Sequence, residues 1–231
     1  MELQTVIDID RQILGVFNDH HSMFFDTLML TLTSGATWIP LYIALLYLVI
    51  KNNETMAQIG LIMACCALCF FITEFVTEGL VKPAVARPRP GNDPEWMYVV
   101  HVVNNHRGRD FSFFSAHAAN TFGIAMFFCL LVRNRVFSWL MVTWSLLNCY
   151  TRLYLAMHYP SDILVGLLFG ACVGSLVYVI YMLVFKQISP PQHYISSQYT
   201  SSGYSLADID VVACVLVLTY VLAIVFSMTL H

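Results

Sequence analysis

The sequence predicts an all-α integral membrane protein, a bundle of six transmembrane helices preceded by an amphipathic helix at the membrane interface. The first observation is composition: 58% of the 231 residues are hydrophobic and 11% are charged, whereas a soluble domain carries about 25% charged residues. The second is a mean hydropathy of +0.70. The third is that apolar residues gather in runs that approach the roughly 20 residues needed to span a bilayer as a helix.

The N-terminal segment, residues 1–35, differs from the rest of the chain. Between Leu3 and Phe17, apolar residues recur at helical spacing on one side, and Asp8 and Arg11 fall on the other. A helix with one apolar and one charged side is typical of a segment that lies in the interface. We therefore expect this helix to rest on the membrane and not to cross it.

The remaining chain is expected to divide into three parts. Residues 36–185 form a core with five spans, residues 186–208 form a polar linker, and residues 209–231 form the last transmembrane helix. The six spans are predicted at 36–51, 56–80, 116–133, 136–155, 161–185 and 209–230. The fifth span carries a glycine every four residues from Gly166 to Gly174, a spacing that favours close helix packing.

Loop charges predict the orientation of the bundle. If the six spans alternate in direction, one end carries the basic residues Lys51, Arg133, Arg135 and Lys186, and the other end carries residues 81–115 with five basic residues. Basic loops mark the cytoplasmic side. We discount the second group because a phosphate site would explain its charge independently. The second end, with both termini, is then expected outside the cytoplasm.

Three groups of polar residues fall at span ends on that same side. They are Lys82-Pro83-Ala84-Val85-Ala86-Arg87-Pro88-Arg89-Pro90, then Ser115-Ala116-His117, then Arg152 with His158 and Asp162. Phosphoryl transfer is catalysed mainly by positioning and by stabilising negative charge. Lysine and arginine side chains bind phosphate oxygens, and a helix N-terminus adds backbone N–H groups. The sequence therefore predicts a phosphate site formed by Lys82, Arg89, Ser115, Ala116 and Arg152.

The histidines supply the expected chemistry. Because His158 precedes the fifth span and Asp162 lies in its first turn, Asp162 can accept from one imidazole nitrogen and leave the other free to attack. His117 is left to protonate the leaving oxygen. Glu78 stands one helical turn before Lys82. It is either a helix-end ion-pair partner or the group that holds the Lys82 ammonium in position for phosphate.

The motifs Lys82-x6-Arg89-Pro90, Ser115-x-His117 and Arg152-x5-His158-x3-Asp162 resemble the three signatures of the type 2 phosphatidic acid phosphatase superfamily. That family includes membrane lipid phosphatases and shares its site with vanadium haloperoxidases. The resemblance implies that His158 forms a phosphohistidine, that Asp162 orients it, that His117 is the general acid, and that no metal or other cofactor is needed. Phe114, Ala116 and Thr151 depart from the usual proline, glycine and serine, but none of these changes removes a catalytic atom.

The resemblance implies an integral membrane enzyme that hydrolyses a lipid phosphate or diphosphate. A six-span chain of this size resembles bacterial inner-membrane members, with the site on the periplasmic face. Undecaprenyl diphosphate, a lipid A phosphate and phosphatidylglycerol phosphate are the candidate substrates. A catalytically silent lipid-phosphate binder or transporter is the alternative, which the complete set of His158, Asp162 and His117 disfavours. A net charge of −3 gives no basis for a nucleic-acid partner, and the oligomeric state is left open.

Overall fold

The computed structural model describes residues 3–105, 107–108, 111–188 and 197–229. Within these ranges the regular elements are helices, which confirms the predicted all-α fold. A π-helical segment, Phe75–Val81, joins α4 to α5. The α-helices are α1 (Leu3–Asn18), α2 (Met23–Thr33), α3 (Ile39–Lys51), α4 (Met56–Glu74), α5 (Lys82–Val85), α6 (Ala116–Val132), α7 (Arg135–Tyr154), α8 (Pro160–Ile188) and α9 (Leu206–Thr229).

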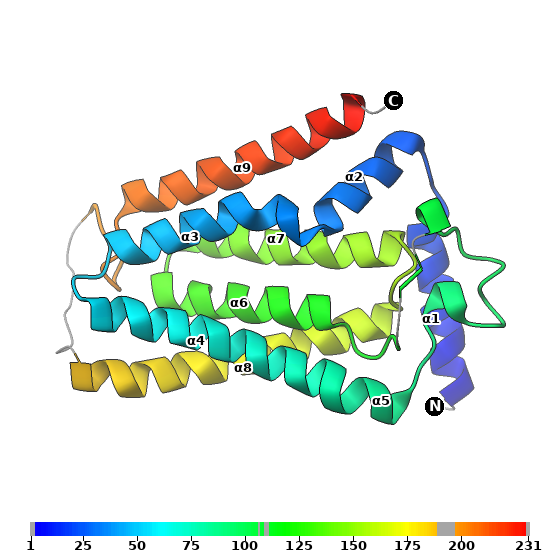
Figure 1. Ribbon diagram of the computed structural model, residues 1–231, viewed down its shortest axis with the longest axis horizontal. Coiled ribbons are helices and arrows are strands. Elements are labelled where there is room, and N and C mark those ends of the chain that lie inside the picture. The colour runs from blue at the N-terminus through cyan, green and yellow to red at the C-terminus, as the bar shows by residue number, and fades with distance from the viewer. Residues whose placement is uncertain (1–2, 106, 109–110, 189–196, 230–231) are drawn as a thin grey trace.

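Helices α2 to α9 form one elongated bundle, and α1 lies across one end of it (Figure 1). The chain passes along the bundle as α2 with α3, as α4 continued into α5, and then as α6, α7, α8 and α9. The short α5, the start of α6, the end of α7 and the start of α8 all lie at the end that α1 covers (Figure 1). The three polar groups predicted from the sequence therefore meet there.

Several of the described helices are long and apolar enough to cross a membrane. Met56–Asn92, α8 and α9 reach this standard alone. Helices α2 and α3 reach it together, as Met23–Thr33 and Gly35–Lys51 with a bend of 67° between them. Helix α6 is apolar but has 17 residues, and α7 carries Asn148 and Arg152 in its second half. A multi-pass membrane protein is thus confirmed, whereas the count of six spans stays a prediction.

A further apolar helix precedes the first predicted span. The predicted span 36–51 covers α3, but α2 precedes it and buries Leu32 in the core of the bundle. Asp26 and the threonines of α2 lower the hydropathy of this segment, so it does not stand out as an apolar run. The Thr27 hydroxyl donates to the Met23 carbonyl at 2.9 Å, so this polar side chain is satisfied within the helix that carries it.

Helix α1 presents two different faces. Asp10 and Leu14 are buried against the bundle. Ile9, Ile13 and Val16 are 43%, 41% and 74% exposed on another face of the helix. An exposed apolar stripe on a helix at the end of a bundle is suited to the membrane interface. The exposed residues of α1 thus support the predicted interfacial location, which stays a prediction.

The described end of the predicted polar linker is attached to the bundle. Residues 189–196 lie outside the described residues. The chain that follows is fixed to the bundle, because the Ser202 hydroxyl donates to the Val132 carbonyl at 2.8 Å and the Ser205 N–H donates to Oδ1 of Asn52 at 2.7 Å. Helix α9 then packs against α2 and α3.

Helices α6 and α8 pack backbone to backbone along the glycines of α8. A Cβ atom on Gly166 would lie 2.7 Å from the Ser115 carbonyl oxygen, and one on Gly170 would lie 2.5 Å from that of Ala119. Both obstacles are backbone atoms that cannot rotate away. The glycine spacing therefore serves packing, as the sequence predicts, and it fixes the start of α8 against the start of α6.

We expect Gly170→Ala to destabilise the protein. Its new methyl group must push α6 and α8 apart, and overpacking of this kind costs about 1–3 kcal/mol. Thermal unfolding in detergent measures the effect as a lower Tm. Gly60→Ala is the matched control, because nothing lies within 4 Å of its added Cβ and alanine favours a helix. A Tm for Gly170→Ala equal to that of the control would contradict the packing role.

Candidate active site

The predicted site residues surround a pocket of about 500 Å³ at the end of the bundle that α1 covers. Its walls are formed by Glu78, Lys82, Arg89, Asn105, Arg107, Gly108, Ala116, His117, Arg152, Met157 and His158. Seven of the nine predicted residues are among them. The other two, Ser115 and Asp162, are fully buried behind the wall.

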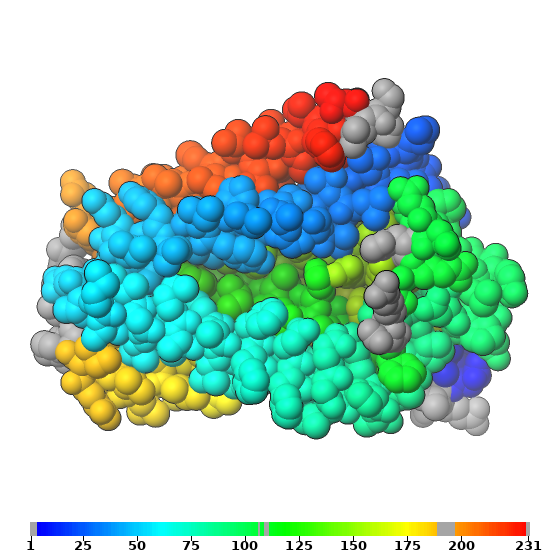
Figure 2. All heavy atoms as spheres, in the orientation of Figure 1, coloured from blue at the N-terminus to red at the C-terminus, as the bar shows by residue number. Residues whose placement is uncertain are grey.

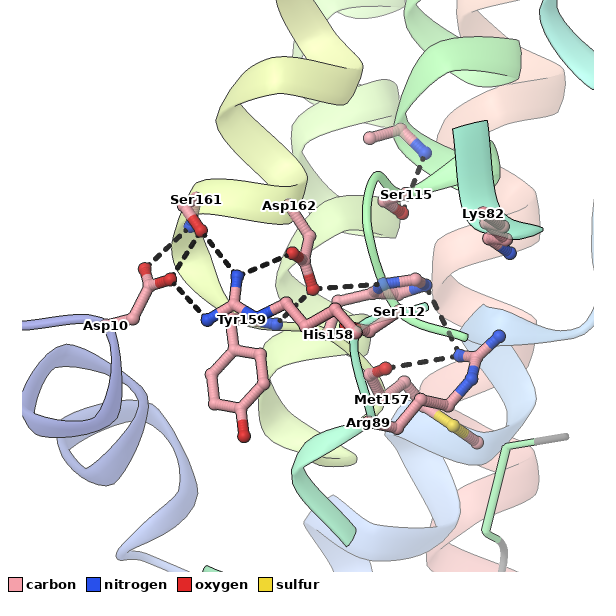
Figure 3. A network of polar contacts seen from close by, with 12 residues as sticks. Asp10, Lys82, Arg89, Ser112, Ser115, Met157, His158, Tyr159, Ser161 and Asp162 are labelled. Carbon is pink, nitrogen blue, oxygen red and sulfur yellow. Dashed lines mark hydrogen bonds and ion pairs between the residues drawn. The ribbon is translucent and has the colours of Figure 1, made fainter. Parts of the chain in front are cut away.

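His158 lies in the turn between α7 and α8 and is 3% exposed. Its Nε2 lies 3.4 Å from Nη1 of Arg89, which also donates to the Met157 carbonyl at 3.2 Å (Figure 3). Burial lowers the pKa of His158 to about 4; Asp162 opposes this effect and Arg89 adds to it. The imidazole is therefore neutral near pH 7, and its Nε2 is available as a nucleophile on the pocket side.

Asp162 stands on the other side of the imidazole. Its Oδ2 is 3.6 Å from Nδ1 of His158 and accepts the Tyr159 N–H at 2.9 Å. Its Oδ1 accepts from Nη1 of Arg87 at 2.9 Å. Within the described part of the chain, Nδ1 of His158 has no hydrogen-bond partner. Because catalytic hydrogen bonds are often long before substrate binds, Asp162 is the group placed to accept this N–H when the two side chains close.

Three cationic side chains converge on the pocket, and each has a contact. The Lys82 ammonium pairs with Glu78. Nη2 of Arg152 lies 2.7 Å from Nδ1 and 2.8 Å from Nε2 of His117. Arg89 faces His158, as described above. A phosphoryl group offers oxygens to all three cations at once, so the arrangement suits a phosphate that lies between them.

Ser115 begins α6 and acts as its cap. Its Oγ accepts the Ala118 N–H at 3.3 Å, and its own N–H donates to the main-chain carbonyl of Asp162 at 3.1 Å. The hydroxyl is thus used inside the protein, and Ala116 forms the pocket wall. The free N–H groups of a first helical turn can bind an anion there. Phosphate binding by Ser115 and Ala116 remains a prediction.

Two positions that depart from the family pattern contribute to packing behind the pocket. The ring of Phe114, which is buried, lies 5.2 Å from that of Phe169 between centroids. The Thr151 hydroxyl donates to the Asn148 carbonyl at 2.7 Å, and its oxygen lies 3.1 Å from the Thr33 hydroxyl. Neither residue lines the pocket.

The loop between α5 and α6 supplies wall residues that sequence reasoning did not assign. Asn105, Arg107 and Gly108 lie over the pocket, and Nε of Arg107 donates to Oδ1 of Asn105 at 3.1 Å. The concentration of arginine in this loop is the sequence feature that could have indicated its place at the pocket. Arg109 and Asp110, its sequence neighbours, lie outside the described residues.

The charge balance of the pocket favours an anion. Its walls carry four basic side chains, Lys82, Arg89, Arg107 and Arg152, against the single carboxylate of Glu78. Among the described residues, no three His, Cys, Asp or Glu side chains are placed to hold one metal ion together. The residues present therefore fit a phosphate-binding site.

We expect Glu78→Gln to lower kcat about tenfold. The Lys82 side chain is 4% exposed and that of Glu78 is 37% exposed, so water screens the pair from one side. A carboxylate that orients the ammonium can then affect the rate, which changes about tenfold for each 1.36 kcal/mol. The rate of phosphate release by purified protein measures this change in kcat. Glu54→Gln, the same substitution at an exposed position, is the control and is expected to keep the wild-type kcat. Wild-type turnover in a folded Glu78→Gln variant would mean that Glu78 is merely an ion-pair partner.

Comparisons with known proteins show which family the chain is similar to. The sequence model of the PAP2 superfamily matches residues 60–186. A lipid A 4′-phosphatase of Bacteroides thetaiotaomicron is 38% identical over 77% of this chain and 79% of that protein. A lipid A 4′-phosphatase of Porphyromonas gingivalis is 26% identical over 78% and 76%. The crystal structure of a transmembrane PAP2-type phosphatidylglycerolphosphate phosphatase from Bacillus subtilis superposes with a TM-score of 0.58 at 18% identity, over 81% of this chain and 90% of that one.

Proposed function

This chain belongs to the PAP2 superfamily, and from this premise we propose that it hydrolyses a phosphate monoester of a lipid A-type glycolipid and so removes the phosphate group. The protein is a membrane lipid phosphatase of a metal-independent family. The observation that carries the proposed chemistry is the placement of His158, whose neutral imidazole lies between Asp162 and the cationic pocket. The observation that favours lipid A is the activity named for the two curated relatives.

The proposed first half-reaction transfers the phosphoryl group to His158. Nε2 attacks phosphorus while the bond from phosphorus to the sugar oxygen breaks. Lys82, Arg89 and Arg152 stabilise the charge on the other phosphoryl oxygens. His117 gives its proton to the departing oxygen, which leaves as a neutral hydroxyl. The result is a phosphohistidine whose Nδ1–H faces Asp162.

The proposed second half-reaction returns the two histidines to the protonation states that they have when substrate is bound. A water molecule attacks the phosphohistidine, and His117, now neutral, takes a proton from it. The bond between phosphorus and Nε2 breaks, and inorganic phosphate leaves. His158 is again neutral and His117 again protonated. Each proton and each bond is thus accounted for by groups of the chain and one water.

An apolar groove beside the pocket supports a lipid substrate. A cavity of about 340 Å³ lies among α3, α4, α6 and α7, with Leu46, Phe70 and Ile124 among its walls. Figure 2 shows it as the hollow between blue α3 and cyan α4, where green atoms of α6 are seen. Asn120 is also among its walls, less than one helical turn from His117 along α6. An acyl chain in the groove would keep the phosphorylated headgroup at the pocket.

Phosphate release from a panel of lipids tests the proposal. Detergent-purified protein is given lipid A, undecaprenyl diphosphate and phosphatidylglycerol phosphate, and free phosphate is measured while mass spectrometry identifies the product. The highest kcat/KM is expected for lipid A, with the loss of one phosphate. Turnover restricted to another lipid would overturn the substrate assignment, and no release from any lipid would overturn the phosphatase.

We also propose a bacterial inner membrane location with the pocket on the periplasmic face. Lys51 ends α3, Arg133 follows α6, Arg135 begins α7 and Lys186 lies near the end of α8, so all four lie at the end of the bundle opposite the pocket. At the pocket end, Arg11 and Arg87 have carboxylate partners in the protein. The first group is therefore the one that marks the cytoplasm.

Thiol labelling in intact cells measures this orientation. In a background without native cysteines, Glu54→Cys is expected to resist a reagent that does not cross the inner membrane, because it lies at the cytoplasmic end. Tyr98→Cys, at a side chain 85% exposed near the pocket, is expected to react. The opposite labelling pattern would invert the topology.

A further inference from the structure

A carboxylate on α1 reaches the catalytic machinery at the start of α8. Asp10 is 4% exposed. Its Oδ1 accepts the backbone N–H of Ser161 at 2.9 Å, and its Oδ2 accepts the Ser161 hydroxyl (Figure 3). Asp162, the partner of His158, is the next residue along the chain. Helix α1 is therefore joined to the first turn of α8 by a buried acidic side chain.

Arg87 links this carboxylate to the second one. Its Nη2 donates to Oδ2 of Asp10 at 2.8 Å, and its Nη1 donates to Oδ1 of Asp162 at 2.9 Å. The guanidinium carbon lies 3.9 Å from the ring centroid of Tyr159, which supports one face of the group. Because the guanidinium is a rigid planar fork, fixing one arm on Asp10 fixes the arm that holds Asp162.

The geometry at Asp162 shows what this link controls. One oxygen is occupied by Arg87, and the other accepts the Tyr159 N–H while it points to Nδ1 of His158. Rotation of the carboxylate would break these bonds and turn Oδ2 away from the imidazole. The orientation of His158 therefore depends on a contact that begins on α1.

We propose that Asp10 is a positioning residue, which through Arg87 holds Asp162 in the orientation that presents His158 to the phosphorus. This role rests on the phosphatase reaction proposed above. Asp10 lies outside residues 60–186, which the family model matches, so α1 adds a support to the family core. The helix then has a task in catalysis besides its place at the membrane interface.

The competing explanation is that Asp10 merely fastens α1 to α8 as a helix cap. Asparagine separates the two roles, because it retains an oxygen for the Ser161 N–H and caps helices as well as aspartate does. It removes the charge that anchors Arg87. Arg87 keeps Asp162 as an ion-pair partner in the variant, so the large cost of leaving a buried charge unpaired does not apply in full. A large loss of turnover with little loss of stability would therefore identify positioning.

The experiment compares Asp10→Asn with wild type for kcat, for inhibition by inorganic phosphate and for Tm. We expect kcat to fall about 10–100-fold, the range typical when a supporting hydrogen-bond partner is lost. The inhibition constant for phosphate is expected to stay within about twofold, because Lys82, Arg89 and Arg152 are untouched. Asp8→Asn makes the same chemical change on the exposed side of α1, where Asp8 accepts from Gln4, and is expected to behave as wild type.

A double-mutant cycle decides whether Asp10 acts through Asp162. In an Asp162→Asn background, adding Asp10→Asn is expected to change kcat by less than about twofold, because residues that act as one unit are not additive. Losses that multiply, or wild-type kcat in Asp10→Asn alone, would overturn the role of Asp10 and leave the phosphatase intact. Absence of lipid phosphate release by wild type would refute both proposals.

Discussion

His158→Ala is expected to reduce phosphate release by about 10⁴-fold or more, as losses of nucleophiles in other enzymes indicate. The alanine variant has no atom that can accept the phosphoryl group, and the three cations cannot replace it. Rapid mixing with a labelled lipid phosphate, followed by alkaline denaturation, is expected to trap phosphoprotein in wild type and none in the variant. The same loss is expected for every phosphate ester, because each must pass through this intermediate.

Binding separates loss of chemistry from loss of fold in this variant. Because Lys82, Arg89 and Arg152 remain, inorganic phosphate should still protect the protein against thermal unfolding. His20→Ala, at an exposed histidine, is the matched control and should keep full activity. Turnover near the wild-type rate in His158→Ala would exclude the phosphohistidine mechanism. Phosphate protection without any turnover in wild type would instead support the silent binder.

The features of the fold that follow from local sequence could be predicted. Long apolar runs indicated most of the helices, and the glycine spacing of α8 indicated a close helix contact, whose partner in the structure is α6. Helix α2 could not be found in this way, because Asp26 and its threonines lower its hydropathy. The hydroxyls of Thr27 and Thr31 are nevertheless satisfied by main-chain carbonyls of the helix. The bend between α2 and α3 depends on packing in three dimensions, which a hydropathy pattern does not contain.

The site could be predicted where spacing along the chain carried the information. Asp162 follows His158 by four positions along the chain, and the structure places the two side chains next to each other. Asp10 and Arg87 are 77 residues apart, and their contact requires α1 to fold across the end of the bundle. An isolated aspartate on an amphipathic helix has the pattern of a solvated charge. Asp10 is buried only because α1 folds against α8, and the sequence does not show this contact. Asp10 was therefore absent from the predicted site.

His117→Ala is expected to separate substrates by their leaving groups. For a lipid phosphate, whose alkoxide is a poor leaving group, the loss of a general acid typically costs about 10²–10⁴-fold. An activated aryl phosphate leaves as a stable anion and needs no proton, so its release should fall far less. Steady-state rates on both substrates measure the difference.

The contact between Arg152 and His117 makes the proposed acid role of His117 depend on bound substrate. An arginine donates and does not accept, so Nη2 at 2.7 and 2.8 Å from the imidazole nitrogens requires a neutral ring that accepts from it. A bound phosphate attracts the guanidinium to its oxygens, which frees His117 to hold the proton that it must give away. His158→Ala supplies the comparison, because removal of the nucleophile should impair both substrates alike. Equal losses on the lipid and the aryl phosphate in His117→Ala would contradict the acid role and leave His117 as a support for Arg152.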